Sequence, residues 1–190
     1  MEPFAKDLRN TVFAALMAAL VIAGSYMAIP IGPVPITLQS MFVLLSGLLL
    51  GKFWGSMALA GYLIAGIVGL PVFAHGKGGL AVLFGPTGGF LISFVVAAFI
   101  TGMISEKSLK LFAGNRSKII IFDIIALIFG SVVIFTLGVS WFKFITGHGW
   151  EQSLGWTLYP FIPGAIVKLI AAAVIAQLVR PIIYKQQNQL

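Results

Sequence analysis

The chain of 190 residues contains no cysteine and very few charged side chains. Without cysteine there are no disulfide bonds, no thiolate chemistry and no metal site built on cysteine. Charged residues make up 9% of the chain, whereas an ordinary globular domain has about 25%. Hydrophobic residues reach 59%, which leaves too little polar surface to cover a soluble fold. The composition therefore predicts a single integral membrane domain, residues 1–190, in a lipid bilayer.

Residue patterns for catalysis, metals and nucleotides are also missing. The histidines His75 and His148 have no partner at ligand spacing, so we expect no metal. The run Gly47–Lys52 has the wrong glycine spacing for a phosphate loop, and Phe53 replaces the required Ser or Thr. No nucleophile, base and orienting acid come together at membrane depth. We expect no cofactor and no enzymatic activity, and any ATP hydrolysis is expected in partner subunits.

Long apolar runs dominate the sequence and predict an all-α protein with six transmembrane helices. Five of these runs reach, or nearly reach, the roughly 20 residues that a helix needs to cross a bilayer. The second run is shorter and is equally interpretable as a tilted or partly re-entrant helix. The six runs cover residues 11–29, 37–50, 53–74, 88–104, 119–142 and 158–179.

The net charge of +7 comes from basic residues that gather on one side of the predicted bundle. Cytoplasmic loops of membrane proteins carry an excess of Lys and Arg. We therefore predict a multi-pass membrane protein with both termini in the cytoplasm, and no nucleic-acid partner. The nine residues on this side are Lys6, Arg9, Lys52, Lys107, Lys110, Arg116, Lys118, Arg180 and Lys185, against Lys77 and Lys143 on the other.

Lys168 carries a charge close to the centre of the last apolar run. A lysine at that depth costs about 2.5–3.5 kcal/mol on insertion scales, so we expect it to face the protein interior. Small neighbours at helical spacing, Gly164 and Ala165 among them, are typical of a helix packed against protein. Two interpretations stay open: Lys168 meets an anionic or hydrogen-bonding ligand, or it is structural and paired with a carboxylate or with backbone carbonyls.

The loops on the predicted outer side, residues 29–39, 69–89 and 139–159, are rich in glycine, proline and aromatic residues. Loops of this length and composition are typical of binding loops and lids. Lys77 lies among glycines that permit a close backbone approach to a ligand. The segment Gly85–Gly89 opens the next helix, whose free N–H groups could bind a carboxylate. The alternative there is a plain turn in which Thr87 caps the helix.

Two further features have alternatives of their own. Ala15, Ala19 and Ala23 line one face of the first run, and such faces let helices approach closely. This face contacts either a partner or the rest of the bundle.

Asp123 lies about one turn inside its run, close to Arg116 and Lys118. We expect it to snorkel or to pair rather than to relay protons.

Four segments together resemble the BioY family, the biotin-binding S components of energy-coupling-factor (ECF) vitamin transporters. They are IPIGPVPITLQ (29–39), GKFWG (51–55), GLPVFAHGKGGLAVLFGPTGGFL (69–91) and PGAIVK (163–168). The resemblance implies six transmembrane helices and a biotin pocket on the outer face, capped by long outward-facing loops. It also implies a transmembrane T subunit and two cytoplasmic ABC-type ATPases as partners.

The resemblance further implies roles for individual residues. Lys168 and Lys77 would be polar contacts to biotin, and Gln39 and Phe73 would line its pocket. Other expected members of the substrate site are Gly85, Thr87, Gly88 and Ala165, and the expected docking residues for the T subunit are Ala15, Ala19 and Ala23. One position departs from the family, because Ala165 stands where Asp is usual, and a ureido N–H of biotin would lose its acceptor there.

The leading hypothesis is a substrate-capture subunit that binds biotin at the outer face and delivers it to an ATP-driven ECF module. The alternative is a self-sufficient secondary transporter for a small carboxylated vitamin, driven by an ion gradient. Asp123, as the sole carboxylate inside a predicted span, gives this alternative its support. An intramembrane enzyme is a third hypothesis.

Overall fold

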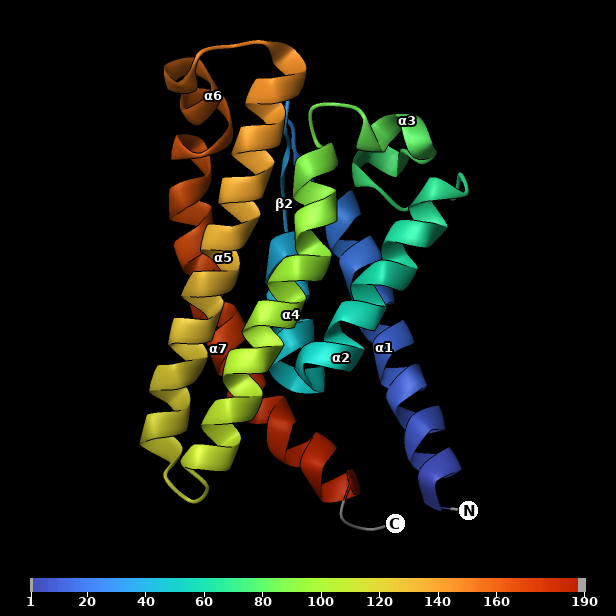
Figure 1. The fold of residues 1–190 in the computed structure, drawn as a ribbon, viewed down its shortest axis with the longest axis vertical. Helices are drawn as coiled ribbons and strands as arrows, with labels where there is room; N and C mark the ends of the chain where they lie inside the picture. Colours follow the sequence, from blue (N-terminus) through green and yellow to red (C-terminus); the bar gives the residue numbers. More distant parts are fainter. Residues whose placement is uncertain (1, 188–190) are drawn as a thin grey trace.

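The computed structural model describes residues 2–187, with side chains described from residue 7 to residue 183. Residues 1 and 188–190, and the predicted cytoplasmic side chains Lys6 and Lys185, lie outside this description. Long helices run along the molecule, and both ends of the chain lie at the same end of the bundle (Figure 1). The helices are α1 (Glu2–Tyr26), α2 (Gln39–Ile67), α3 (Leu80–Leu83), α4 (Gly88–Leu111), α5 (Arg116–Thr146), α6 (Trp150–Thr157) and α7 (Ile162–Gln187).

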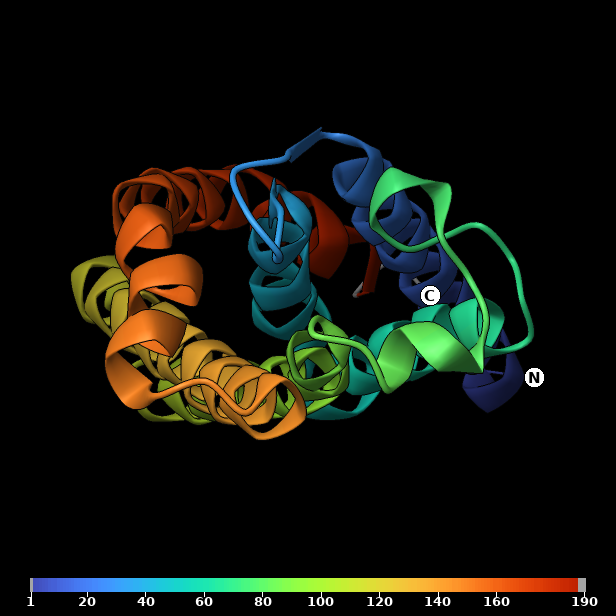
Figure 2. The same cartoon turned by 90° about the horizontal axis from the view of Figure 1, so that it is seen from above.

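Short elements gather at the opposite end. Strands β1 (Ala28–Ile29) and β2 (Ile36–Thr37) form an antiparallel hairpin between α1 and α2. Two single 3₁₀ turns, η1 (Ala74–Gly76) and η2 (Tyr159–Phe161), precede α3 and α7. Seen from above, α6 connects α5 to α7, while the hairpin crosses from α1 to the first part of α2 (Figure 2). The long loops predicted on one side therefore contain most of the short structure of the molecule.

Five of the described segments are long and apolar enough to cross a membrane. Large hydrophobic side chains also cover the outside, with Leu16, Phe129 and Ile170 more than half exposed. A soluble protein would bury such side chains, whereas lipid-facing helices expose them. The prediction of a mostly helical, multi-pass membrane protein is confirmed. The five segments are Asp7–Tyr26, Gln39–Ile67, Gly88–Leu111, Arg116–Thr146 and Trp150–Ile183.

The predicted runs 37–50 and 53–74 form two arms of the single element α2. Gly51 breaks the helix with φ 78° and ψ −176°, and the chain then runs back toward the loop end (Figure 1). A Cβ added at Gly55 would lie only 2.9 Å from the carbonyl oxygen of Ser46. In a straight helix these positions would be about 13 Å apart. The second arm ends at Ile67, earlier than the predicted residue 74, because Gly69 takes φ 103° and Pro71 follows.

Charged side chains satisfy the backbone groups that the break in α2 exposes. In an unbroken helix the N–H of Lys52 would bond to the carbonyl of Leu48. Instead, this N–H donates to Glu106 Oε1 at 2.9 Å, and Arg180 Nη2 donates to the Leu48 carbonyl at 3.2 Å. Unpaired backbone groups are costly in a bilayer, so α4 and α7 stabilise the reversal of α2.

Other boundaries also differ from the prediction. The first helix ends at Tyr26, before the predicted residue 29, because the chain enters strand β1. Helix α7 begins at Ile162, where residue 158 was predicted, since α6 and η2 occupy the preceding residues. Helices α4 and α5 extend past their predicted ends, residues 104 and 142, because polar and basic residues continue them beyond the apolar run.

Candidate functional site

A cavity of about 220 Å³ lies at the loop end of the bundle. Its wall combines the β1–β2 hairpin and the 73–77 turn with residues from α2, α3, α4, α5 and α7. Its apolar side chains include five phenylalanines from four separate segments: Phe73, Phe90, Phe94, Phe135 and Phe161. Its polar side chains are Thr37, Gln39, Ser40, His75, Lys77, Thr87 and Lys168. An apolar chamber with a few placed polar groups is the usual form of a small-molecule site.

Lys168 is 9% exposed and lies in the wall of this cavity. Its Nζ donates to the carbonyl oxygen of Thr37 at 3.1 Å and to Ser40 Oγ at 2.9 Å. The backbone-carbonyl pairing foreseen in the structural interpretation is therefore present, but no carboxylate contacts the ammonium within the described residues. An ammonium has three N–H donors, so one remains for a ligand in the cavity.

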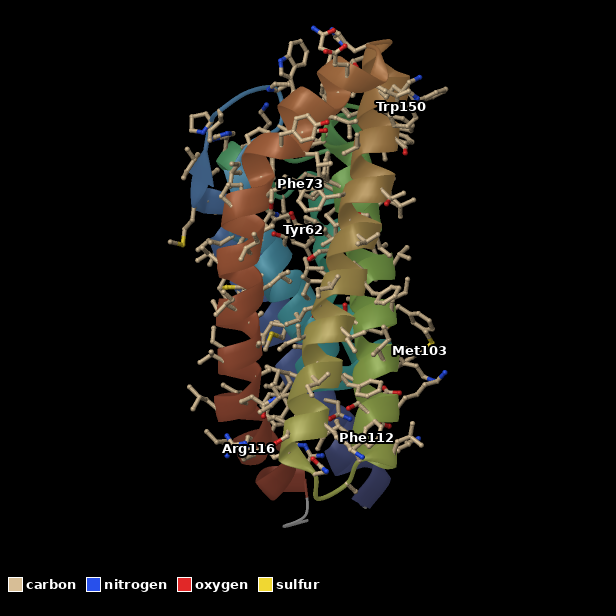
Figure 3. The ribbon with its side chains drawn as sticks, turned by 90° about the vertical axis from the view of Figure 1, so that its left-hand side faces the viewer. Tyr62, Phe73, Met103, Phe112, Arg116 and Trp150 are labelled. Carbon is tan, nitrogen blue, oxygen red and sulfur yellow. The ribbon has the colours of Figure 1, made fainter. Side chains whose placement is uncertain are left out.

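Gln39 forms a fixed part of the wall at the start of α2. Its Nε2 donates to Tyr62 Oη at 2.6 Å, and its Oε1 accepts from Thr37 Oγ1 at 3.1 Å. The ring of Tyr62 meets that of Phe73 edge-on at 5.6 Å, and both residues are almost fully buried. Figure 3 shows Tyr62 and Phe73 in the upper part of the molecule, far from Phe112 and Arg116 at the opposite end.

Lys77 is exposed and belongs to a tight turn at the edge of the cavity. The N–H of Phe73 donates to the Lys77 carbonyl at 2.9 Å, and His75 adopts φ 60° between them. At Gly78 an added Cβ would lie 2.3 Å from the Leu70 carbonyl oxygen. Gly78 therefore lets this loop pack closely against the backbone at Leu70. From the sequence, these glycines were expected to let the backbone approach a ligand.

The segment before α4 contributes less to the cavity than expected. Thr87 lines it, whereas Gly85 and Gly88 do not. The Gly85 carbonyl accepts a hydrogen bond from Trp141 Nε1 at 3.0 Å, and Gly88 lies tightly against the backbone of Leu83. The Thr87 side chain makes no capping hydrogen bond, so the predicted side-chain cap is wrong. Its helical φ and ψ, −91° and −9°, differ from the extended backbone typical of a capping residue.

Ala165 lies outside the main cavity. It lines a small adjacent void of about 10 Å³, together with Ser40, Ser131 and Lys168. Among the described residues, no Asp or Glu lines either the cavity or this void. The lysine side of the site therefore carries positive charge without a local acidic partner.

Asp123 is buried and paired, but its partner is not the one expected. Arg180 holds both carboxylate oxygens, with Nη1 at 2.7 Å and Nη2 at 3.0 Å, and Gln177 Nε2 donates at 2.9 Å. The predicted partners, Arg116 and Lys118, are exposed. Arg180, counted from the sequence among the basic residues of the predicted cytoplasmic side, is itself only 6% exposed. Helix packing brings the two together across 57 residues of sequence.

The alanine face of α1 points away from the bundle. Ala15, Ala19 and Ala23 are exposed, whereas Ala14 and Val21 on the other side of the helix are buried. The alternative that these three alanines pack within the bundle is therefore wrong. The face stays free for a contact outside this chain.

Sequence reasoning missed Ser40, Thr37, Tyr62 and the four phenylalanines Phe90, Phe94, Phe135 and Phe161. Single hydroxyl groups and aromatic residues are common in apolar runs, so none of them gave a signal of its own. Ser40 follows Gln39 directly, and this neighbourhood was the one sequence feature that could have drawn attention to it.

Comparison with known proteins agrees with this architecture. The model of the BioY family matches residues 1–185. This chain belongs to the BioY family. It is 39% identical to the biotin transporter BioY of Thermotoga maritima over 89% of this chain and 94% of the relative. It is 35% identical to the biotin transporter BioY of Rhizobium etli, over 90% and 92% of the two chains.

A solved structure is also similar to this BioY chain. It is a crystal structure of the S-component for biotin from an ECF-type ABC transporter. The TM-score is 0.82 at 32% identity, and the match covers 93% of each chain. The helical architecture is therefore shared over nearly the whole length.

Proposed function

We propose that this chain is a biotin-binding S component that captures biotin at the outer face of a prokaryotic plasma membrane and delivers it to an ATP-driven ECF module. The names of its relatives and the solved S-component support the ligand. The cavity supports it independently, because its chemistry matches a small, largely apolar molecule that carries a carboxylate.

The observation that carries the proposal is Lys168 in the cavity wall without an acidic neighbour. Lys168 and Lys77 line the cavity, and no Asp or Glu in the described part of the chain does. Charge-assisted hydrogen bonds to an ammonium are among the stronger contacts that a site can offer. In this proposal the two lysines contact the polar ends of biotin, and the phenylalanines pack on its apolar atoms.

A competition experiment tests this charge complementarity. Biotin methyl ester keeps the shape of the ligand but lacks the negative charge. We expect biotin to displace radiolabelled biotin from the purified protein at a markedly lower concentration than the ester does. Equal potency of the two compounds would contradict a cavity selective for a carboxylate.

We further propose six transmembrane helices, with α2 contributing two, both termini in the cytoplasm, and loops that cap the pocket from outside. The common end of the termini and the basic residues there support this topology. A reporter active only in the cytoplasm, fused to the carboxyl terminus, should give signal. The same reporter inserted at residue 148 should be silent, and the reverse pattern would contradict the orientation.

The proposed partners are a transmembrane T subunit, contacted through Ala15, Ala19 and Ala23, and two ABC-type ATPases. The exposure of these alanines supports the contact, since small residues let helices approach closely. Ala15→Trp should abolish uptake and complex formation while leaving biotin affinity within about twofold. Ala14 packs inside the bundle, so Ala14→Trp is the matched control, and we expect this variant to fail to fold.

The alternative of a gradient-driven transporter loses its support in this structure. Asp123 is held by Arg180, Gln177 and Ser105 inside the bundle, and it does not line the cavity. Uptake by proteoliposomes separates the two functions. We expect accumulation of biotin only when the ATPases and ATP are present, whereas a gradient-driven protein would accumulate it alone.

A further inference from the structure

We propose that Ser40 is a positioning residue for Lys168, holding its ammonium at the site where it meets the ligand. The proposal rests on the proposed function, because Lys168 is assigned there to the binding of biotin. In this proposal Ser40 affects biotin binding only through its contact with Lys168. Its neutral hydroxyl holds the ammonium in place, as a carboxylate otherwise would.

The contact joins two distant parts of the chain. Ser40 lies in the first turn of α2, 128 residues before Lys168, and its Oγ accepts from Nζ at 2.9 Å. The Thr37 carbonyl takes a second N–H at 3.1 Å. A lysine side chain has several rotatable bonds, and two fixed acceptors on one side restrict it to one arrangement. The third N–H is thereby presented to the cavity, which Ser40 and Lys168 both line.

The surroundings explain why a hydroxyl has this role. Ala165 lies three residues before Lys168, on the same face of α7, and shares the small void with Ser40 and Lys168. Its methyl group offers no hydrogen bond. Thr37 accepts through its backbone carbonyl, so Ser40 is the one side chain among the described residues that accepts a hydrogen bond from Nζ. A carboxylate at position 165 would reach the same ammonium and make Ser40 redundant.

A double-mutant cycle of Ser40→Ala and Ala165→Asp tests this redundancy. Biotin affinity is measured for the four proteins by equilibrium titration. We expect Ser40→Ala to weaken binding about tenfold in the Ala165 background, the size of one hydrogen bond to a charged group. In the Ala165→Asp background the same change should cost less than about twofold, because the carboxylate holds the lysine.

Three controls separate positioning from general structure. Ser40→Thr keeps the hydroxyl and should retain most of the affinity. Ser46→Ala removes a hydroxyl of α2 that bonds only to its own helix, at the Val43 carbonyl, and should leave affinity unchanged. The thermal midpoint of ligand-free Ser40→Ala should stay close to that of the wild type, which excludes misfolding as the cause.

The outcomes are distinct. A tenfold loss in both backgrounds would show that Ser40 acts on the ligand without Lys168, and would overturn the proposal. No loss in either background would overturn it as well. If the wild-type protein fails to bind biotin, the proposed function is wrong and this proposal fails with it. If the wild type binds biotin but the effects of the two substitutions simply add, only the positioning role of Ser40 is refuted.

Discussion

Lys168 and Arg180 are two buried cations on the same helix, α7, with opposite environments. Arg180 contacts both oxygens of Asp123, and Gln177 and Ser105 also donate to this carboxylate. Lys168 lies about 18 Å away along the helix and lines a cavity, and its hydrogen-bond partners among the described residues are one hydroxyl and one carbonyl. One charge is neutralised by a counter-ion, and the other has no acidic partner among the described residues.

Under the proposed function, this difference separates a structural charge, Arg180, from a charge that binds the ligand, Lys168. The Asp123–Arg180 pair lies next to the break in α2, where Arg180 also bonds to the Leu48 carbonyl that the break exposes. Removing one member of such a pair leaves an uncompensated charge. Lys168 has already given up part of its solvation without gaining a counter-ion, so a carboxylated ligand can supply what the chain does not. Burial of a charge is therefore a poor guide to function until its partners are known.

The largest effect is expected at the structural pair. Asp123→Ala leaves the Arg180 guanidinium buried and unpaired, which should lower the free energy of unfolding by about 3–5 kcal/mol. Thermal unfolding in detergent measures this loss. The double variant Asp123→Leu/Arg180→Met replaces both charges by apolar groups and should recover most of the stability. A double variant as unstable as Asp123→Ala would contradict the role of Arg180 as its partner.

A smaller effect is expected at the break in α2. Glu106→Ala removes the acceptor for the Lys52 N–H, and loss of a helix cap costs about 1 kcal/mol. Glu106→Gln keeps an oxygen in place and should be milder. Both variants are measured by the same thermal unfolding, with Lys107→Ala as the neighbouring control. An unchanged midpoint for Glu106→Ala would show that this contact does not stabilise the reversal.

The smallest effect on stability is expected at Lys168. Lys168→Ala removes a charge from the membrane interior, so the free energy of unfolding should be unchanged or higher. Arg180→Ala, twelve residues further along α7, should instead destabilise strongly because it leaves Asp123 unpaired. Similar destabilisation by both variants would remove the distinction between a structural and a binding charge.

Local sequence rules predicted the features that depend on short stretches of chain. Hydropathy located Lys168 inside a span, and the small-residue spacing identified the face of Ala15, Ala19 and Ala23. The boundary between the second and third apolar runs fell at Gly51 and Lys52, where a charged residue interrupts the apolar pattern. These signals need no knowledge of how the helices pack.

Features that depend on helix packing could not be predicted. Arg180 was predicted only as one of the basic residues of the cytoplasmic side, because nothing in its own segment indicates that it contacts Asp123. Ser40 gave no signal, since a lone serine in an apolar run usually bonds to its own helix, as Ser46 does. Thr87 occupies the expected N-cap position of α4, yet with its backbone conformation the side chain makes no capping hydrogen bond.

The most direct test of the account is an equilibrium titration of the purified protein with biotin, on the wild type and on Lys168→Ala side by side. The wild type should bind saturably, with one biotin per chain. Lys168→Ala should bind about ten- to a hundredfold more weakly, because a hydrogen bond involving a charged group is lost. Unaltered affinity in Lys168→Ala, or no binding by the wild type, would contradict the assignment of this cavity to biotin.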